Sequence, residues 1–191
     1  DNVEKTNIVK RILKALDALN VRDVFFMPDS YGIGRRAIQD VEVDVILSHI
    51  EMEMTSTAAD SQIAAGLMAD LDVACIITLG GDGTNRMVAK ACGDIPLLPI
   101  STGTNNVFPY MIEGTLAGMA AGILADQALF REEGLQQKPV LEIYRDDQLL
   151  DIALIDIVVT DDAYVGSRAV WEIDSIREIF LSRNTPACIG F

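Results

Sequence analysis

Three glycines, an acid and a hydroxyl residue follow directly on the apolar run that ends at Leu79. They are Gly80, Gly81, Asp82, Gly83 and Thr84. Glycine lets the backbone approach a ligand closely, and a helix that starts after the loop offers unpaired N–H groups and the positive end of its dipole. These are the properties of a phosphate-binding loop. In that position the Asp82 carboxylate can bind Mg²⁺ or accept a proton from a hydroxyl group.

A second polar loop follows the next apolar run, which covers residues 96–100. It consists of Ser101, Thr102, Gly103, Thr104, Asn105 and Asn106. Their hydroxyl, amide and N–H groups are suited to hydrogen bonding with phosphate, ribose or adenine. Two such loops favour a nucleotide site over the simpler interpretation, in which Asp82 caps a helix after a tight turn and the second loop merely enters a helix.

Apolar residues recur at helical spacing near the start of the chain, and short apolar runs then alternate with helical patterns. The expected strands cover residues 24–27, 43–47, 73–79 and 96–100, and the expected helices cover residues 4–19, 35–41, 63–71, 84–91 and 114–130. This alternation predicts an α/β fold, with a Rossmann-like parallel sheet and helices on both faces. Right-handed crossovers then place loops 28–34, 80–84 and 101–106 at the carboxyl edge of the sheet, where we expect them to form one pocket.

The pattern changes after Gln136. Strands are expected over residues 140–144 and 149–159, separated by a polar turn, and a helix over residues 175–183. We therefore expect an α/β nucleotide-binding domain over residues 1–136, then the start of a β-rich second domain over residues 137–191 that is incomplete in this chain. Its open strand edges call for a further segment or a partner subunit, and a homo-oligomer is expected.

The composition excludes some classes of partner. The chain carries 29 acidic against 15 basic residues, a net charge of −14. This charge repels nucleic acid and anionic lipid headgroups, so neither nucleic acid nor a permanent membrane association is expected. The three cysteines match neither a zinc site nor a redox pair, and their small number fits a cytoplasmic protein. The single histidine, His49, is expected to be a surface or structural residue rather than a metal ligand.

The loop after the first expected strand contains a short glycine pattern. Gly32, Gly34 and Ala37 fit G-x-G-x-x-A, and Glu51 and Glu53 lie at roughly the offset of ~20 residues at which dinucleotide-binding domains place an acid. Such patterns often occur by chance, and a long turn precedes the first glycine. A Rossmann-type oxidoreductase is therefore a minor alternative.

Together the motifs resemble those of the superfamily of NAD kinases, diacylglycerol kinases and sphingosine kinases. After the GGDGT loop, the residues that match the lipid-kinase form of the second motif are Pro99, Gly103, Thr104, Asn106 and Phe108. The loop at residues 27–32 is similar to the first phosphate loop of that superfamily. Over nearly its whole length, from residues 28–32 through 104–109 to 165–168, the chain looks most like the acetoin-catabolism X group, which is described as ATP-NAD kinase-like.

The resemblance implies ATP-dependent phosphoryl transfer to the hydroxyl group of a small-molecule acceptor, with NAD as that acceptor and Mg²⁺ as an expected cofactor. It implies that Asp82 is the catalytic base or positions the metal. The residues that would hold the nucleotide and its phosphates are Asp29, Ser30, Gly32, Gly80, Gly81, Gly83, Thr84, Thr102, Gly103, Thr104, Asn105 and Asn106. No set of side-chain metal ligands is predicted. A lipid kinase and a non-catalytic regulator that binds ATP or NAD remain open as alternatives.

Overall fold

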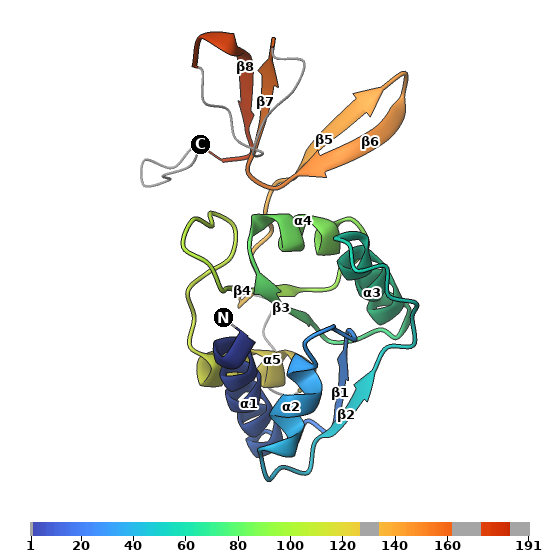
Figure 1. Cartoon of the computed structure of the whole chain (residues 1–191), viewed down its shortest axis with the longest axis vertical. Coiled ribbons are helices and arrows are strands. Elements are labelled where there is room, and N and C mark those ends of the chain that lie inside the picture. The colour runs from blue at the N-terminus through green and yellow to red at the C-terminus, as the bar shows by residue number, and fades with distance from the viewer. Residues whose placement is uncertain (1, 127–133, 162–172, 184–191) are drawn as a thin grey trace. The chain divides into compact units, whose positions relative to one another are not determined.

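The computed structural model describes residues 2–126, 134–161 and 173–183 (Figure 1). The chain divides into two compact units, Asp1–Gln136 and Gln137–Phe191. Helices and strands alternate in the first unit, whereas the second contains antiparallel strands. The predicted class, an α/β fold followed by a β-rich part, is confirmed. The elements of the first unit are α1 (Asn2–Ala18), β1 (Asp23–Phe26), α2 (Ile33–Gln39), β2 (Ile46–His49), α3 (Ala59–Asp70), β3 (Ile76–Gly80), α4 (Asp82–Ala89), β4 (Leu97–Ser101) and α5 (Gly114–Ala125).

The strands of the first unit form two parallel pairs. β1 pairs with β2, with Val24 opposite Leu47, and β3 pairs with β4, with Gly80 opposite Ser101. Within the described residues each pair is a separate two-stranded sheet, so the single continuous sheet that we predicted is not observed. Side-chain packing joins the pairs instead, because Val24 contacts the same apolar core as β3 and β4.

Helices cover both faces of the β3–β4 pair. Neighbouring residues of a strand point to opposite faces. Ile77 and Leu98 accordingly pack with α1 and α5 around Ile100, whereas Ile76 and Leu97 pack against α3 and α4. The two layers of helices can be followed in Figure 1. Burial on both faces explains why these strands are nearly continuous apolar runs in the sequence.

α1 and α5 pack closely because α5 presents small residues to α1. Gly114, Gly118 and Gly122 recur at every fourth position of α5 and therefore share one face of the helix. A Cβ atom added at Gly118 would lie 2.7 Å from the Cβ of Ala15 and 2.7 Å from the carbonyl oxygen of Ile12. Glycine is thus required at this position by the short distance between the two helices.

The described residues of the second unit contain two antiparallel pairs of strands. β5 (Leu141–Arg145) pairs with β6 (Gln148–Ala153), and β7 (Asp156–Thr160) pairs with β8 (Ile176–Leu181). The two residues that link β5 to β6 both have positive φ, which is the turn geometry that matches the right-handed twist of paired strands.

Two predictions for the second unit were wrong. Residues 149–159 are not one strand but parts of β6 and β7, separated by a bend at Leu154 and Ile155. Residues 175–183 do not form an α-helix: β8 follows a short 3-10 helix, Ile173–Ser175. Pairing with β7 and the β-branched and aromatic side chains of β8 favour the extended chain.

The hairpins of the second unit expose large apolar side chains. They are Tyr144, Leu149, Leu150, Val159, Ile179, Phe180 and Leu181. In the described residues each hairpin is a separate two-stranded sheet, and an isolated hairpin is at best marginally stable in water. These strands therefore need further contacts, and their supply by a further segment or a partner subunit stays a prediction.

We expect Gly118→Ala to lower the free energy of unfolding by about 1–2 kcal/mol, because overpacking against α1 outweighs the gain in helix propensity. The urea midpoint measures the change. Gly66→Ala in α3 is the matched control, since its Cβ would meet the Cβ of Ala91 at 3.7 Å, an ordinary contact. That substitution should raise stability by about 0.5–1 kcal/mol. Equal effects of the two substitutions would contradict the packing argument.

Candidate functional site

The chain passes directly from a strand into a helix at the GGDGT sequence. Gly80 is the last residue of β3, Gly81 is extended (φ −103°, ψ −167°), and Asp82 is the first residue of α4. The helix therefore begins at Asp82 rather than at Thr84, where we predicted it. As a result, the unpaired N–H groups of its first turn lie at the carboxyl end of β3.

The glycines at this junction have different roles. A Cβ atom at Gly80 would lie 2.5 Å from Oγ1 of Thr84, and one at Gly81 would lie 2.5 Å from Oδ1 of Asn106. A side chain at Gly80 would therefore clash with Thr84, whereas one at Gly81 would displace the amide of Asn106. Gly83 is exposed, and a Cβ atom there would have no heavy atom within 4 Å. The start of α4 is thus open on the side of Gly83, where a ligand can approach its backbone.

The carboxylate of Asp82 joins the two polar loops. Its Oδ1 accepts a hydrogen bond from the N–H of Phe108 at 2.7 Å, and both of its oxygens accept from the N–H of Val107 at 3.1 Å. In the structure the second loop runs from Ser101 to Tyr110, and its ends are joined because the N–H of Ser101 donates to the carbonyl oxygen of Tyr110 at 2.8 Å. The structure thus brings the GGDGT sequence and the second loop together through a contact that was not predicted.

Asn106 shapes the second loop from inside. Its Nδ2 donates to Oγ of Ser101 at 2.8 Å, and its Oδ1 lies against Gly81. This side chain is therefore used in the structure of the loop itself. The other predicted residues of the loop are half-buried or exposed, and they are Thr102, Gly103, Thr104 and Asn105.

A buried polar pair beneath the junction was also missed. Oγ1 of Thr78 donates to Oδ1 of Asn85 at 2.7 Å, and Nδ2 of Asn85 donates to the carbonyl oxygen of Gly81 at 2.9 Å. Thr78 is 5% exposed and Asn85 is fully buried. The available signal was a polar residue in a buried strand and another on the inner face of the following helix, where apolar residues are expected.

The loop at residues 28–34 has local contacts. The carboxylate of Asp29 accepts hydrogen bonds from the N–H groups of Tyr31 at 2.9 Å and Ile33 at 3.0 Å, which caps the first turn of α2. Gly32 has a φ of 62°, and a Cβ atom at Gly34 would lie 2.7 Å from the ring of Phe26. A turn and close packing thus account for the glycine spacing here without a dinucleotide. That this loop, with Ser30, joins the other two loops stays a prediction.

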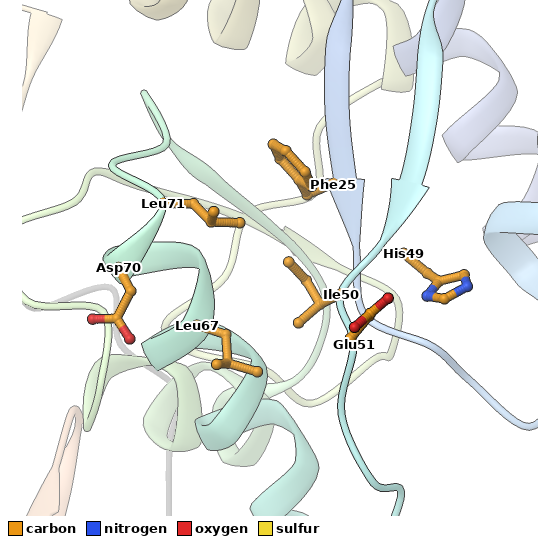
Figure 2. A pocket seen from close by; sticks show the side chains of 7 residues that line it. All are labelled: Phe25, His49, Ile50, Glu51, Leu67, Asp70 and Leu71. Carbon is orange, nitrogen blue, oxygen red and sulfur yellow. The ribbon is translucent and has the colours of Figure 1, made fainter.

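A pocket of about 260 Å³ lies elsewhere in the first unit, between the β1–β2 pair and α3 (Figure 2). It is lined by Phe25, His49, Ile50, Glu51, Leu67, Asp70 and Leu71. Figure 2 shows Asp70 and the His49 ring turned away from the apolar side chains. His49 is exposed, and its ring meets that of Phe26 edge to face at 6.2 Å. The pocket contains none of the predicted nucleotide-binding residues.

Metal-binding side chains do not cluster in the described residues, where no group of three or more His, Cys, Asp or Glu could hold an ion. Mg²⁺ that accompanies ATP is held largely by phosphate oxygens and needs one or two protein carboxylates, and Asp82 can supply one at the joined loops. Cys75 and Cys92 are core residues, as expected, and burial raises the pKa of the Cys75 thiol to about 11. Cys188 lies outside the described residues.

Asp60 is a buried carboxylate that was not predicted as a site residue. It lies in the first turn of α3 and accepts hydrogen bonds from Oγ1 of Thr55 at 2.7 Å, from the N–H of Thr55 at 2.8 Å and from the N–H of Ser56 at 2.8 Å. The Thr55 hydroxyl and these N–H groups lower the pKa of Asp60 below its ordinary value. The carboxylate thus fixes the segment that connects β2 to α3.

An α/β unit in which a glycine sequence opens into a helix, with an acid at the junction, is typical of kinase-like or related nucleotide-binding proteins. Comparison with known families gives the same class. Residues 1–128 match the family model of the ATP-NAD kinase N-terminal domain, and residues 139–191 match that of the C-terminal domain of acetoin catabolism protein X. The chain belongs to the ATP-NAD kinase family.

Among curated proteins, the chain is similar to acetoin catabolism protein X of Cupriavidus necator, with 37% identity over 199 aligned positions. The alignment covers 98% of this chain and 55% of that protein, so the chain spans about half the length of the curated relative it matches. The resemblance inferred from the motifs is confirmed. No solved structure matches the chain. Among the helices of the described segments, none combines the length and the apolar character needed to cross a bilayer.

Asp60→Asn should reduce stability most near neutral pH. A lowered pKa means that the charged carboxylate stabilises the folded state above its ordinary pKa, and that this contribution disappears as the pH falls through the folded-state value. The difference in urea midpoint between wild type and Asp60→Asn should therefore shrink between pH 7 and about pH 3. A difference that stays constant with pH would show that the charge has no part in it.

Asp82→Ala should release the second loop. Loss of the carboxylate removes the acceptor of the Val107 and Phe108 N–H groups, so their hydrogen exchange should become roughly tenfold faster or more. Asp82→Asn keeps an oxygen acceptor and should have a smaller effect. The N–H of Tyr110, which donates to the carbonyl oxygen of Pro99, is the internal control. Unchanged exchange at Val107 and Phe108 would refute the proposed link between the loops.

Proposed function

We propose that this chain is the nucleotide-binding part of an ATP-dependent kinase that transfers the γ-phosphate of ATP to a hydroxyl group of NAD. The observation that carries the proposal is the position of Asp82, in the first turn of α4 and held to the second loop by two N–H groups. The N–H groups at the start of α4, which can bind an anion, and the Asp82 carboxylate therefore lie at the same end of the helix. Membership of the ATP-NAD kinase family supports the choice of ATP and NAD.

The proposed reaction needs a base and charge neutralisation. The acceptor oxygen bonds to the γ-phosphorus, the bond from that phosphorus to the bridging oxygen of ADP breaks, and the hydroxyl proton passes to Asp82. Oδ1 of Asp82 takes part in both loop contacts, whereas Oδ2 shares the 3.1 Å contact with Val107. A carboxylate oxygen has two lone pairs, so Oδ2 keeps acceptor capacity for the hydroxyl group. Mg²⁺, when bound with ATP, offsets the phosphate charge.

The remaining residues would bind and orient the nucleotide. The N–H groups around Gly81 and Gly83 would hold phosphate at the open start of α4, and Thr84 would pack over Gly80 behind them. Thr104 and Asn105, which are exposed, would contact ribose or base. Phosphoryl transfer depends chiefly on positioning, so these contacts matter more than any further reactive group.

One observation favours a second candidate, a nucleotide-binding regulator without turnover. The hydrogen bonds from Val107 and Phe108 give Asp82 a structural role that requires no chemistry. In a regulator the same carboxylate would keep the second loop in place for ATP or NAD and would never take a proton. The two candidates therefore differ in whether the charge of Asp82 is needed for turnover.

Asp82→Asn should lower the turnover number by roughly 10²-fold or more, the scale for loss of a general base. ATP affinity should change little by comparison, because an asparagine oxygen can still accept from the second loop and the N–H groups of α4 remain. Single-turnover phosphorylation by the purified full-length protein, with NAD as acceptor, measures the first effect. Calorimetric titration with ATP measures the second.

Asp72→Asn is the matched control, because it makes the same chemical change at an exposed turn residue with positive φ, a conformation that asparagine tolerates. It should leave turnover and affinity unchanged. Full turnover by Asp82→Asn would refute the role of base. ATP binding by the wild type without turnover, with NAD or with a diacylglycerol-type lipid, would favour the regulator, and turnover with the lipid alone would favour a lipid kinase.

A further inference from the structure

The carbonyl group of Gly81 is held from two sides by one residue. It accepts from the backbone N–H of Asn85 at 3.1 Å and from Nδ2 of the same residue at 2.9 Å. A carbonyl oxygen has two lone pairs, and both are engaged here. The first bond belongs to any α-helix, whereas the second is peculiar to the asparagine side chain. The orientation of this carbonyl is therefore fixed more firmly than the first turn of a helix requires.

The orientation of this carbonyl also sets that of an N–H group. The peptide between Gly81 and Asp82 is planar and trans, so its N–H points opposite to its C=O. Because the C=O points along α4 toward Asn85, the N–H of Asp82 points out of the start of the helix. That direction is the one from which an anion meets the N-terminus of a helix.

The Gly81 carbonyl determines which way the Asn85 amide faces, and the Thr78 hydroxyl completes the pair. The carbonyl oxygen of Gly81 can only accept a hydrogen bond, so Nδ2 must face it and Oδ1 must face Thr78. The Thr78 hydroxyl must then donate, and it does so at 2.7 Å. Thr78 belongs to β3 and stands opposite Pro99 of β4. One chain of contacts thus runs from β3 through the Thr78 hydroxyl and the Asn85 amide to the Gly81 carbonyl. The peptide of that carbonyl carries the N–H of Asp82.

Neither residue is required for stability alone. Replacing both partners of a buried hydrogen bond by apolar groups of the same shape can be nearly neutral or even stabilising, and valine has nearly the shape of threonine. Asparagine is also a weak helix former. Thr78 and Asn85 nevertheless link β3 to α4 through their hydrogen bond, and both are almost completely removed from solvent.

We propose that Thr78 and Asn85 are positioning residues that aim the N–H of Asp82 at the phosphate of a bound nucleotide. The inference rests on the proposed function. It adds a pair of buried residues that would affect nucleotide binding without contacting the nucleotide. A purely structural pair would affect the stability of the folded protein and leave its affinity for ATP alone. The two roles are therefore separated by measuring affinity and thermal unfolding on the same variants.

The test is calorimetric titration of the full-length protein with ATP. Thr78→Val removes the hydroxyl at nearly constant shape and should weaken ATP binding by about tenfold, the scale of one lost hydrogen bond that leaves a buried partner unsatisfied. Thr78→Ser restores the hydroxyl and should restore most of the affinity. Val88→Ala, in the buried core of the same helix, should lower the unfolding temperature and leave the affinity at the wild-type value.

Asn85→Asp tests the other end of the chain of contacts. A carboxylate can still accept from Thr78, but it cannot donate to the Gly81 carbonyl, so ATP binding should again weaken by about tenfold or more. Wild-type affinity in Thr78→Val would overturn the inference and leave the proposed function standing. Loss of cooperative unfolding in both variants would assign the pair to the fold and likewise overturn it. A wild-type protein that binds no ATP would overturn the proposed function, and the inference with it.

Discussion

The candidate site depends on one contact, in which the N–H groups of Val107 and Phe108 converge on the carboxylate of Asp82. Hydrogen bonds to a charged acceptor are stronger than those between neutral groups, and the start of a helix favours negative charge. A short polar loop would otherwise have few apolar contacts to hold it. The Asp82 carboxylate therefore stabilises the conformation of the second loop through these hydrogen bonds.

Parallel register makes that contact possible. Gly80, the last residue of β3, lies opposite Ser101, the last residue of β4. Both polar segments consequently leave the sheet side by side, as parallel strands require of segments that follow their carboxyl ends. The absence of side chains at Gly80 and Gly81 then lets Thr84 and Asn106 close over the junction. The close fit at this point comes from backbone geometry together with small residues.

The parts of the fold and of the candidate site that could be predicted from the sequence are those formed by contiguous residues. The GGDGT loop and the loop at residues 101–106 are each one run of suitable side chains, and the strands before them are dense apolar runs. The donors of Val107 and Phe108 are backbone groups, which carry no residue identity, so no pattern could indicate them. Thr78 and Asn85 lie on different elements and meet only after folding. The error at residues 175–183 arose because a short apolar run fits both periods, and tertiary pairing decides between them.

The glycine face of α5 also bears on how the first unit is made in a cell. Among the described elements of that unit α1 is the first and α5 the last, and the core that they share with β3 and β4 contains residues from both. Because α1 is synthesised before α5, its apolar face stays uncovered until α5 has been made, and contacts distant in sequence form late. During that interval Ile12 and Leu16, buried in the finished unit, are available to chaperones. Docking of α5 thus covers the apolar face of α1 late in synthesis.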